Sequence, residues 1–487
     1  MPVPGFRRAA APVTFAVAFL VAGCASTHGL APQDQPTPTD SLAASGSLGA
    51  FSKADFPHDD WWKALGDPQL DALIDEALHG TPTLAAADAR LRSAIAQAGL
   101  AESLHKPSLA VGAQYAGLRI PETVGPGSFG GSYQGIVLLT MNFKYDPDFW
   151  GAKRAKWQAA IGQARAAEVE AQAARLMLAS NIASTYVVLA QATAARDVAV
   201  AEKARASHLL DLSRQRVQAG LDSQLPLRQA EAGVAAAQQQ AEAAQQHIDA
   251  TRNALAALLG KGPDRALSIA KPTLLTAPAP GVPSVLPSEL LGHRPDVVAA
   301  RWRVEAAERG IASSKAAFYP TVNLSALVGL ASGGLTDLFD TGALLVQGGP
   351  AISLPIFDGG GLRNQLAKSD ADYDLAVATY NESLVTALRE VTDALQAARA
   401  LDAQIAATRE ARDAASAAWQ LAQSRYHAGL GTQLDVLAAQ QPLLQLDQQL
   451  AALHAQRLTA VIDLDRALGG GLNPVAPSSA SDLAKSR

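Results

Sequence analysis

The sequence predicts an α+β membrane protein in which one chain supplies four transmembrane β-strands and long antiparallel α-helical hairpins, arranged as two internal repeats. Three observations lead to this fold class. The stretch Ala219-Gly220-Leu221 recurs as Ala428-Gly429-Leu430 at an offset of 209 residues, and a repeat of this size sets the whole architecture. Each copy lies between two long alanine-rich helical patterns. Segments of alternating hydrophobicity precede each pair of helices.

The composition is that of a large, helix-rich protein without a nucleic-acid partner. The 487 residues are 48% hydrophobic but only 17% charged, and the small alanine side chains in the apolar share let helices approach closely. A net charge of −5 provides no basic patch for nucleic acid. The single cysteine excludes an internal disulfide and a cysteine-based zinc site, and we expect no cofactor and no metal.

Residues 1–23 have the layout of a secretory signal peptide. Arg7 and Arg8 precede an apolar run over 9–22 that is too short to span a bilayer. The small residues before Cys24 resemble a bacterial lipobox, in which this cysteine is diacylated and becomes the mature N-terminus. The alternative is a plain signal peptide with an incidental cysteine. Because no aspartate follows Cys24, the lipobox resemblance implies the outer membrane, where two or three acyl chains give firm anchoring.

The first repeat is expected at 56–260, after a flexible, lipid-anchored tether over 24–55 that is rich in Pro, Ser, Thr, Gln and Gly. Trp61-Trp62 opens the repeat and is more simply a packing anchor than a ligand site. Short amphipathic helices follow from Pro68 and from about residue 82.

Strands are predicted at 108–119 and 132–145, because apolar residues there alternate with polar or small ones. Leu109, Val111 and Tyr115 share one face of the first strand, and Val137, Met141 and Phe143 share one face of the second. This alternation is typical of membrane β-strands. A half-buried hairpin of a soluble protein would have the same pattern.

A helical hairpin is predicted over 151–260. Past Gly151, its first arm up to Ala219 contains no proline and only one glycine, Gly162, so the helix is on the order of 100 Å long. Such a length indicates a coiled coil or the wall of a tube, since globular helices seldom exceed about 20 residues.

The second repeat is expected at 288–470, after a proline-rich linker over 261–287. Its predicted elements are a helix at 295–317, strands at 321–330 and 345–356, and a helical hairpin at 360–468. The tail 471–487 is polar and is expected to be disordered. Four strands cannot close on themselves, and an open sheet edge is not tolerated in lipid, so several copies must pool their strands into one barrel.

The sequence resembles the outer-membrane factors of tripartite efflux systems, the TolC-like family, and especially its OprM/NodT-type lipoprotein branch. The resemblance covers nearly all of the mature chain. Its most specific parts are the stretches 292–300 and 312–321, the Trp61-Trp62 opening, the Phe357-Asp358-Gly359-Gly360 turn and the two Ala-Gly-Leu turns. It implies a homotrimer with a twelve-stranded β-barrel on a twelve-helix periplasmic α-barrel. It also implies a passive conduit that receives substrates from a periplasmic adaptor (membrane fusion) protein and an inner-membrane pump of the RND type.

The resemblance places the two helix turns at the periplasmic tip, where adaptor hairpins dock. Backbone geometry alone explains Gly220 and Gly429, since a helix reversal needs left-handed conformations. Leu221 and Leu430 are apolar at a position that should be solvated, which favours contact with an adaptor.

The family also closes its tip with rings of polar and charged side chains. Tyr426 and Asp435 match positions of the TolC-type gate region, and Asp222 lies beside the other turn. The latch arginine of TolC is matched by Gly431 and a second gate aspartate by Ala438, so a latch here would use Arg216 or Arg425 instead. The alternative for each of these side chains is a solvated charge at a helix end.

The leading function is therefore export of small molecules such as drugs and toxic compounds through an outer-membrane channel. An outer-membrane duct for type I protein secretion shares the fold and stays an alternative. A structural periplasmic coiled-coil lipoprotein or adaptor is the alternative from another class, and the paired alternating strands argue against it. No nucleophile elbow, phosphate loop or paired-carboxylate site emerges, so the sequence offers no case for an enzyme.

Overall fold

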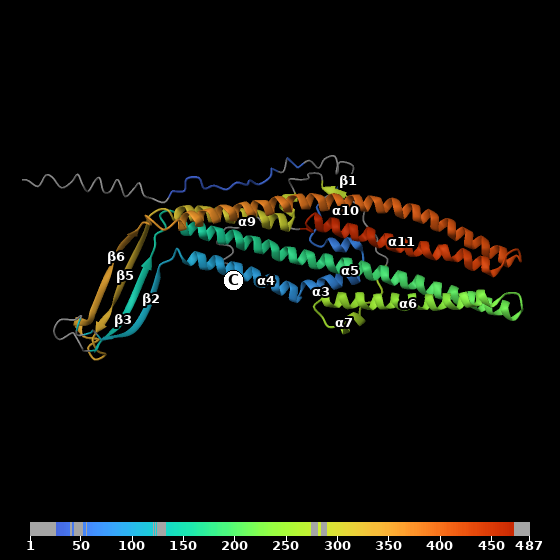
Figure 1. Cartoon of the computed structure of the whole chain (residues 1–487), viewed down its shortest axis with the longest axis horizontal. Helices are drawn as coiled ribbons and strands as arrows, with labels where there is room; N and C mark the ends of the chain where they lie inside the picture. The colour runs from blue at the N-terminus through green and yellow to red at the C-terminus, as the bar shows by residue number, and fades with distance from the viewer. Residues whose placement is uncertain are drawn as a thin grey trace, which may run out of the picture.

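The protein is long and narrow, with a β-sheet at one end and two helix turns at the other (Figure 1). The computed structural model describes residues 26–38, 41–42, 52–54, 56–119, 121, 123, 133–273, 281–283 and 290–471. The predicted signal peptide, the lipidated Cys24 and the tail beyond residue 471 lie outside the described residues, so the expectations about them stay predictions.

Two helices of 67 residues each, α5 (Ala152–Gln218) and α10 (Gly361–His427), run the length of the helical body. At about 1.5 Å per residue, each is on the order of 100 Å long. Shorter helices flank them on the sheet side, α4 (Pro82–Ser103) and α9 (Pro295–Ala316), and on the tip side, α6 (Gln224–Leu258) and α11 (Gln433–Ala467). The packing order is α4-α5-α9-α10 near the sheet and α6-α5-α11-α10 near the tip (Figure 1).

The internal repeat is confirmed in the lengths of these helices. The return helices α6 and α11 both have 35 residues, and every boundary of the second hairpin lies 209 residues after that of the first. Of the described helices, α5 alone contains a stretch long and apolar enough to cross a membrane. Because α5 supplies many of the buried side chains of the core, packing explains its apolar character.

The sheet consists of β2 (Ser108–Arg119), β3 (Tyr133–Tyr145), β5 (Thr321–Ser332) and β6 (Leu344–Ser353), all antiparallel in this order. The pairing of β3 with β5 joins the two repeats. The predicted alternation is confirmed, since Val111 lies opposite Met141, Met141 opposite Val328, and Val328 opposite Val346. One apolar face therefore continues across all four strands, and β2 and β6 are the unpaired edges.

The fourth strand ends earlier than the sequence indicates. It covers Leu344–Ser353 instead of 345–356, and β5 extends to Ser332 instead of residue 330. The register accounts for the early end, since Ser353 lies opposite Thr321, the first residue of β5, and beyond it β6 has no partner in that strand.

The largest core lies at the middle of the helical body. Here η2 (Trp61–Leu65) and α3 (Pro68–Leu78) pack against α5, and side chains of α6 and α11 complete the cluster. Trp61 and Trp62 are both buried in it, which agrees with the prediction that they are packing anchors. Full burial of an aromatic or large aliphatic side chain contributes about 2 kcal/mol, so this cluster is the main apolar support of the middle region.

A buried carboxylate fixes the start of α3. Asp67 accepts hydrogen bonds from the Tyr186 hydroxyl (3.0 Å), from Thr273 Oγ1 (2.8 Å) and from the Gln69 amide (2.9 Å). Burial raises the pKa of Asp67, but these hydrogen bonds outweigh burial and hold the pKa below its ordinary value. The contacts join α3 to α5 and to the segment after α7.

The predicted linker and tether contain more structure than their compositions indicate. The linker holds α7 (Asp264–Leu267) and β4 (Gly281–Pro283), and α8 (Leu290–His293) follows it. Strand β4 pairs in parallel with β1 (Ser52–Ala54), which lies within the predicted tether.

The segment 26–38 of the predicted tether lies along α10. The amides of Gln33 and Asp34 donate to Asp374 Oδ1 (2.9 and 3.0 Å), and the Thr37 amide donates to Asn381 Oδ1 (2.8 Å). The prediction of a flexible tether is therefore wrong for this segment. The extended backbone satisfies its amides with side chains of a distant helix, and the composition of the segment carries no sign of that.

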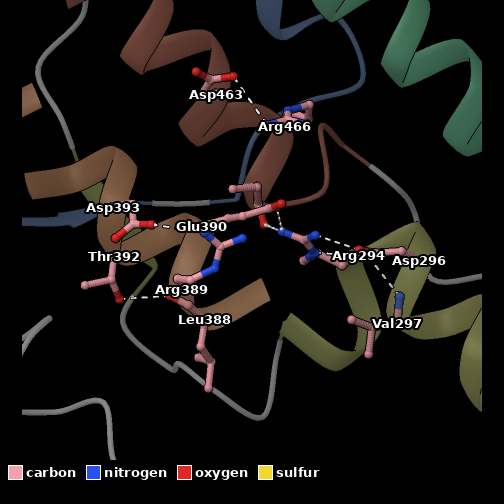
Figure 2. A network of polar contacts seen from close by, with 11 residues as sticks. Arg294, Asp296, Val297, Leu388, Arg389, Glu390, Thr392, Asp393, Asp463 and Arg466 are labelled. Atoms are coloured by element: carbon pink, nitrogen blue, oxygen red, sulfur yellow. Dashed lines mark hydrogen bonds and ion pairs between the residues drawn. The ribbon is translucent and has the colours of Figure 1, made fainter. Parts of the chain in front are cut away.

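Arg294 joins the start of α9 to both helices of the second hairpin. Its side chain is 7% exposed and donates to Asp296 Oδ2 (2.6 Å), to Glu390 Oε2 on α10 (2.8 Å) and to the Ala467 carbonyl on α11 (3.1 Å). Figure 2 shows this guanidinium between Asp296 and Glu390. The planar guanidinium meets three acceptors on three elements, which a lysine cannot do.

Arg294→Ala should lower the free energy of unfolding by about 3 kcal/mol, because Glu390 then lies partly buried without its cation. Chemical denaturation of the detergent-solubilised protein measures the loss. Arg389→Ala is the matched control, since Arg389 pairs only with Asp393 on its own exposed helix face (3.6 Å) and should cost about 0.5 kcal/mol or less. Equal losses for the two variants would contradict the role given to Arg294.

Candidate functional site: the helical tip

Both helix reversals at the tip have the same backbone hydrogen bonds. Gly220 and Gly429 have φ values of 73° and 71°, in the left-handed region that favours glycine. The amide of Leu221 donates to the Arg216 carbonyl (2.9 Å), and that of Leu430 donates to the Arg425 carbonyl (2.8 Å). These are the bonds of a Schellman motif, so the predicted geometric role of the two glycines is confirmed.

The two leucines that follow the glycines project from the tip. Leu221 is 66% exposed and Leu430 is 71% exposed. In a Schellman motif, the residue at this position usually packs against the residue five positions earlier. That residue is Arg216 in one turn and Arg425 in the other, so neither leucine has an apolar partner in its own turn.

The return helices begin with side-chain caps. The Ser223 side chain accepts a hydrogen bond from the Leu225 amide (3.4 Å) at the start of α6. At the start of α11, Thr432 Oγ1 accepts from the Asp435 amide (3.3 Å), and Asp435 Oδ2 accepts from the Thr432 amide (2.8 Å). This reciprocal pair is a capping box, and its Thr-x-x-Asp spacing is a signal that was visible in the sequence.

The Asp435 carboxylate is therefore held at the helix start. Hydrogen bonds from the Thr432 amide and hydroxyl, with a smaller contribution from the charge of Arg425, hold the pKa of Asp435 below its ordinary value. The carboxylate stays charged down to acidic pH. Its local role as a cap was not part of the expectation that it lines a gate.

The first turn contains an ion pair that the second turn lacks. Arg216 Nε donates to Asp222 Oδ2 (2.6 Å) and Arg216 Nη2 donates to Asp222 Oδ1 (3.2 Å), and the pairing lowers the pKa of Asp222. Arg425 instead donates to the Leu430 carbonyl (3.3 Å), and Tyr426 lies beside His427 with its ring centroid 5.7 Å away.

The structure thus groups the gate candidates by turn. Arg216 and Asp222 form a pair at one turn, and Arg425, Tyr426 and Asp435 surround the other. Both turns are fully described, and no hydrogen bond or ion pair joins them within one chain. In the described ranges, no three His, Cys, Asp or Glu side chains gather closely enough to hold a metal ion.

The paired helical hairpins, the four-stranded sheet and the exposed tip define a channel protein of the bacterial outer membrane, and the family comparison agrees. Residues 73–261 and 286–470 match the outer membrane efflux protein family, so the chain belongs to this family.

Curated relatives and solved structures support the same assignment. The chain is 38% identical to the fusaric acid resistance protein FusA of Burkholderia cepacia over 379 residues, which cover 76% of this chain and 71% of FusA. It is 31% identical to the multidrug resistance outer membrane protein MdtP of Escherichia coli K12 over 468 residues, covering 93% and 94% of the two chains. The crystal structure of the outer membrane protein VceC from Vibrio cholerae matches with a TM-score of 0.77 at 39% identity, covering 85% of this chain and all of VceC.

The predicted family, fold class, efflux function and outer-membrane location are therefore confirmed. The Campylobacter jejuni CmeC outer membrane channel, at 23% identity and a TM-score of 0.85 over 94% of this chain and 98% of CmeC, supports the fold alone. The protein is an outer-membrane component of an efflux system. The roles of the tip residues stay predictions.

Gly429→Ala should strain the second turn by about 1 kcal/mol, because alanine rarely adopts a positive φ. A Cβ at this position would meet nothing within 4 Å, so the effect is one of backbone conformation alone. Hydrogen exchange at the Leu430 amide measures it. Gly431→Ala is the control, since Gly431 has no positive φ and its Cβ would make an ordinary 3.4 Å contact with Arg425. Equally fast exchange in both variants would contradict the interpretation.

Proposed function

We propose that three copies of the chain assemble into a conduit that passes small molecules from a periplasmic adaptor and an inner-membrane pump of the RND type to the exterior. The open edges of the protomer carry this proposal. Strands β2 and β6 each have one unpaired side, and such edges are not stable in lipid. Helices α6 and α10 likewise form the outer members of the tip layer. Three copies pair every edge and give twelve strands above twelve helices.

Small organic compounds are the proposed cargo, and passage through the conduit is passive. The relatives have names that refer to fusaric acid resistance, multidrug resistance and toluene efflux. These names favour export of small molecules over a type I protein secretion duct. The four-stranded sheet, with its continuous apolar face, disfavours a purely structural coiled-coil lipoprotein.

The tip is the proposed adaptor-docking surface and the proposed gate. Leu221 and Leu430 give it exposed apolar contacts, which a partner can bury. In a trimer, symmetry brings three copies of each acidic side chain toward the axis, where like charges repel. Arg216 offsets Asp222 within each turn. Asp435 shares a capping box with Thr432, and the proposed closed tip also contains Tyr426 and Arg425.

The lipid anchor at Cys24 is part of the same proposal. The carbonyls of Ser26 and His28 accept hydrogen bonds from Arg363, which lies at the sheet end of α10. At the same end, Trp150 stacks on Tyr319 with ring centroids 4.8 Å apart, and such aromatic residues are enriched at membrane interfaces. An acyl chain on a residue two positions before Ser26 would therefore start close to the membrane surface.

Leu221→Glu combined with Leu430→Glu should abolish efflux while the trimer still forms, because charged side chains at the turn oppose burial by an adaptor. Drug susceptibility of a strain that lacks its own outer-membrane channel measures efflux, and native electrophoresis measures assembly. Leu267→Glu is the control, since Leu267 is 83% exposed in α7, far from the tip. Unchanged drug resistance in the double variant would count against docking at the tip.

The purified wild-type protein should begin at Cys24 and carry two or three acyl chains, which intact mass and peptide mass spectrometry would detect. Cys24→Ala should yield a protein without this added mass. A wild-type Cys24 that reacts with maleimide as a free thiol would exclude the anchor and leave the channel proposal in place.

A further inference from the structure

The tip third of each hairpin has little apolar support within the protomer. We define this tip third as residues 193–247 of the first hairpin and 406–449 of the second, all of which the structure describes. A few of its apolar side chains are buried, among them Leu210, Leu437 and Leu443, but none of the five clusters of buried apolar side chains includes a residue from these ranges. Segments with few buried apolar contacts open locally at low free energy. Individual polar contacts therefore matter more in the tip third than in the middle of the body.

One side-chain hydrogen bond crosses between the two hairpins in the tip third. Arg205 Nη1 on α5 donates to the Leu437 carbonyl on α11 (3.2 Å). The other side-chain hydrogen bonds within the tip third join residues of the same hairpin. An example is the bond from Arg412 Nε on α10 to Asp447 Oδ1 on α11 (3.0 Å). We call the Arg205–Leu437 contact the interhairpin bond.

Arg205 is held in place for this contact. Its Nε and Nη2 donate to the two carboxylate oxygens of Glu202 (2.8 and 2.6 Å), and its side chain is only 9% exposed. The ion pair with Glu202 uses Nε and Nη2 and the interhairpin bond uses Nη1, so releasing the Leu437 carbonyl does not by itself require the ion pair to break. A hydrogen bond from a guanidinium to a carbonyl adds about 1–2 kcal/mol to the packing between the two helices, and its release costs less than breaking the charge-assisted pair with Glu202 would.

The helix that receives the bond is weakened a short distance beyond it. Pro442 lies inside α11 and has no amide hydrogen. The carbonyl four residues earlier, that of Ala438, therefore lacks its helical hydrogen bond, and Ala438 directly follows Leu437. The equivalent position of α6, at the offset of 209, is Gly233, another helix-weakening residue. A Cβ at Gly233 would meet nothing within 4 Å, so packing inside the protomer does not require a glycine there.

We propose that α11 bends at Pro442 when the tip opens and that the interhairpin bond from Arg205 holds it in the closed position. Arg205 is then a positioning residue of the gate, distinct from the charged residues at the turns. The inference rests on the proposed function, since it assumes a conduit whose tip opens. Gly233 gives α6 of the first hairpin a helix-weakening residue at the matching position. The parts of α5 and α10 that lie in the tip third contain neither proline nor glycine.

Hydrogen exchange of the purified full-length protein tests the interhairpin bond. Arg205→Ala should speed exchange in peptides covering 433–443 by about tenfold and leave peptides covering 450–467 unchanged. Arg205→Lys should restore part of the protection. Arg214→Ala is the matched control, since Arg214 lies on the same helix but pairs only with Asp211 on that helix (3.5 Å). Equal exchange in Arg205→Ala and Arg214→Ala would overturn the inference.

Pro442→Ala tests the bend independently, because it restores an amide hydrogen to α11 and favours folding. It should slow exchange in the same peptides and lower the open fraction of channels in planar bilayers, whereas Arg205→Ala should raise that fraction. Unchanged exchange in Pro442→Ala would overturn the bend. A wild-type protein that forms no channel would count against the proposed function, while the exchange rates would still decide the inference.

Discussion

The requirement that every backbone amide and carbonyl in lipid be paired governs this molecule. Four strands from one chain leave two edges, on β2 and β6, with unsatisfied groups. Such edges can only be satisfied by other copies of the sheet, so the chain is incomplete alone. The same incompleteness extends along the body, where α6 and α10 end the helical layer as β2 and β6 end the sheet. The unpaired strand edges and the outer helices of the protomer are therefore the surfaces at which neighbouring copies complete the barrel.

The features predicted from the sequence are the local and periodic ones. The alternating strands and the glycines with positive φ depend on residues close together in the chain, and the 209-residue offset is a repeat of the sequence itself; the structure has all three. The features that were missed depend on partners far apart. Asp374 binds the segment 26–38 across more than three hundred residues, and the composition of that segment suggests only flexibility. The crossing bond from Arg205 to Leu437 ends on a carbonyl oxygen, which every residue has, so no side-chain pattern marks it.

At the tip, the structure gives Asp435 a local role that the sequence-based prediction of a gate did not include. Asp435 was expected at a gate because its position matches that of the family, and the structure gives it a cap with Thr432. The two roles are compatible, since a carboxylate that caps a helix still carries its charge. Asp222 differs, because Arg216 offsets its charge at the turn. The sequence does not show how each charge is satisfied, whereas the hydrogen-bond partners in the structure distinguish the two acids.

The duplication that produced two hairpins has a consequence for symmetry. In a trimer, the tip presents six glycine turns around one axis with nearly identical backbones, and they alternate between two kinds, one with an arginine–aspartate pair and one with a capping box. For a partner that contacts only Leu221 and Leu430, the six turns are nearly equivalent and the ring has pseudo-sixfold symmetry. For a partner that contacts the charged side chains, the ring has threefold symmetry. The first arrangement has six equivalent positions and the second has three, and the side chains that differ between the two repeats make the difference.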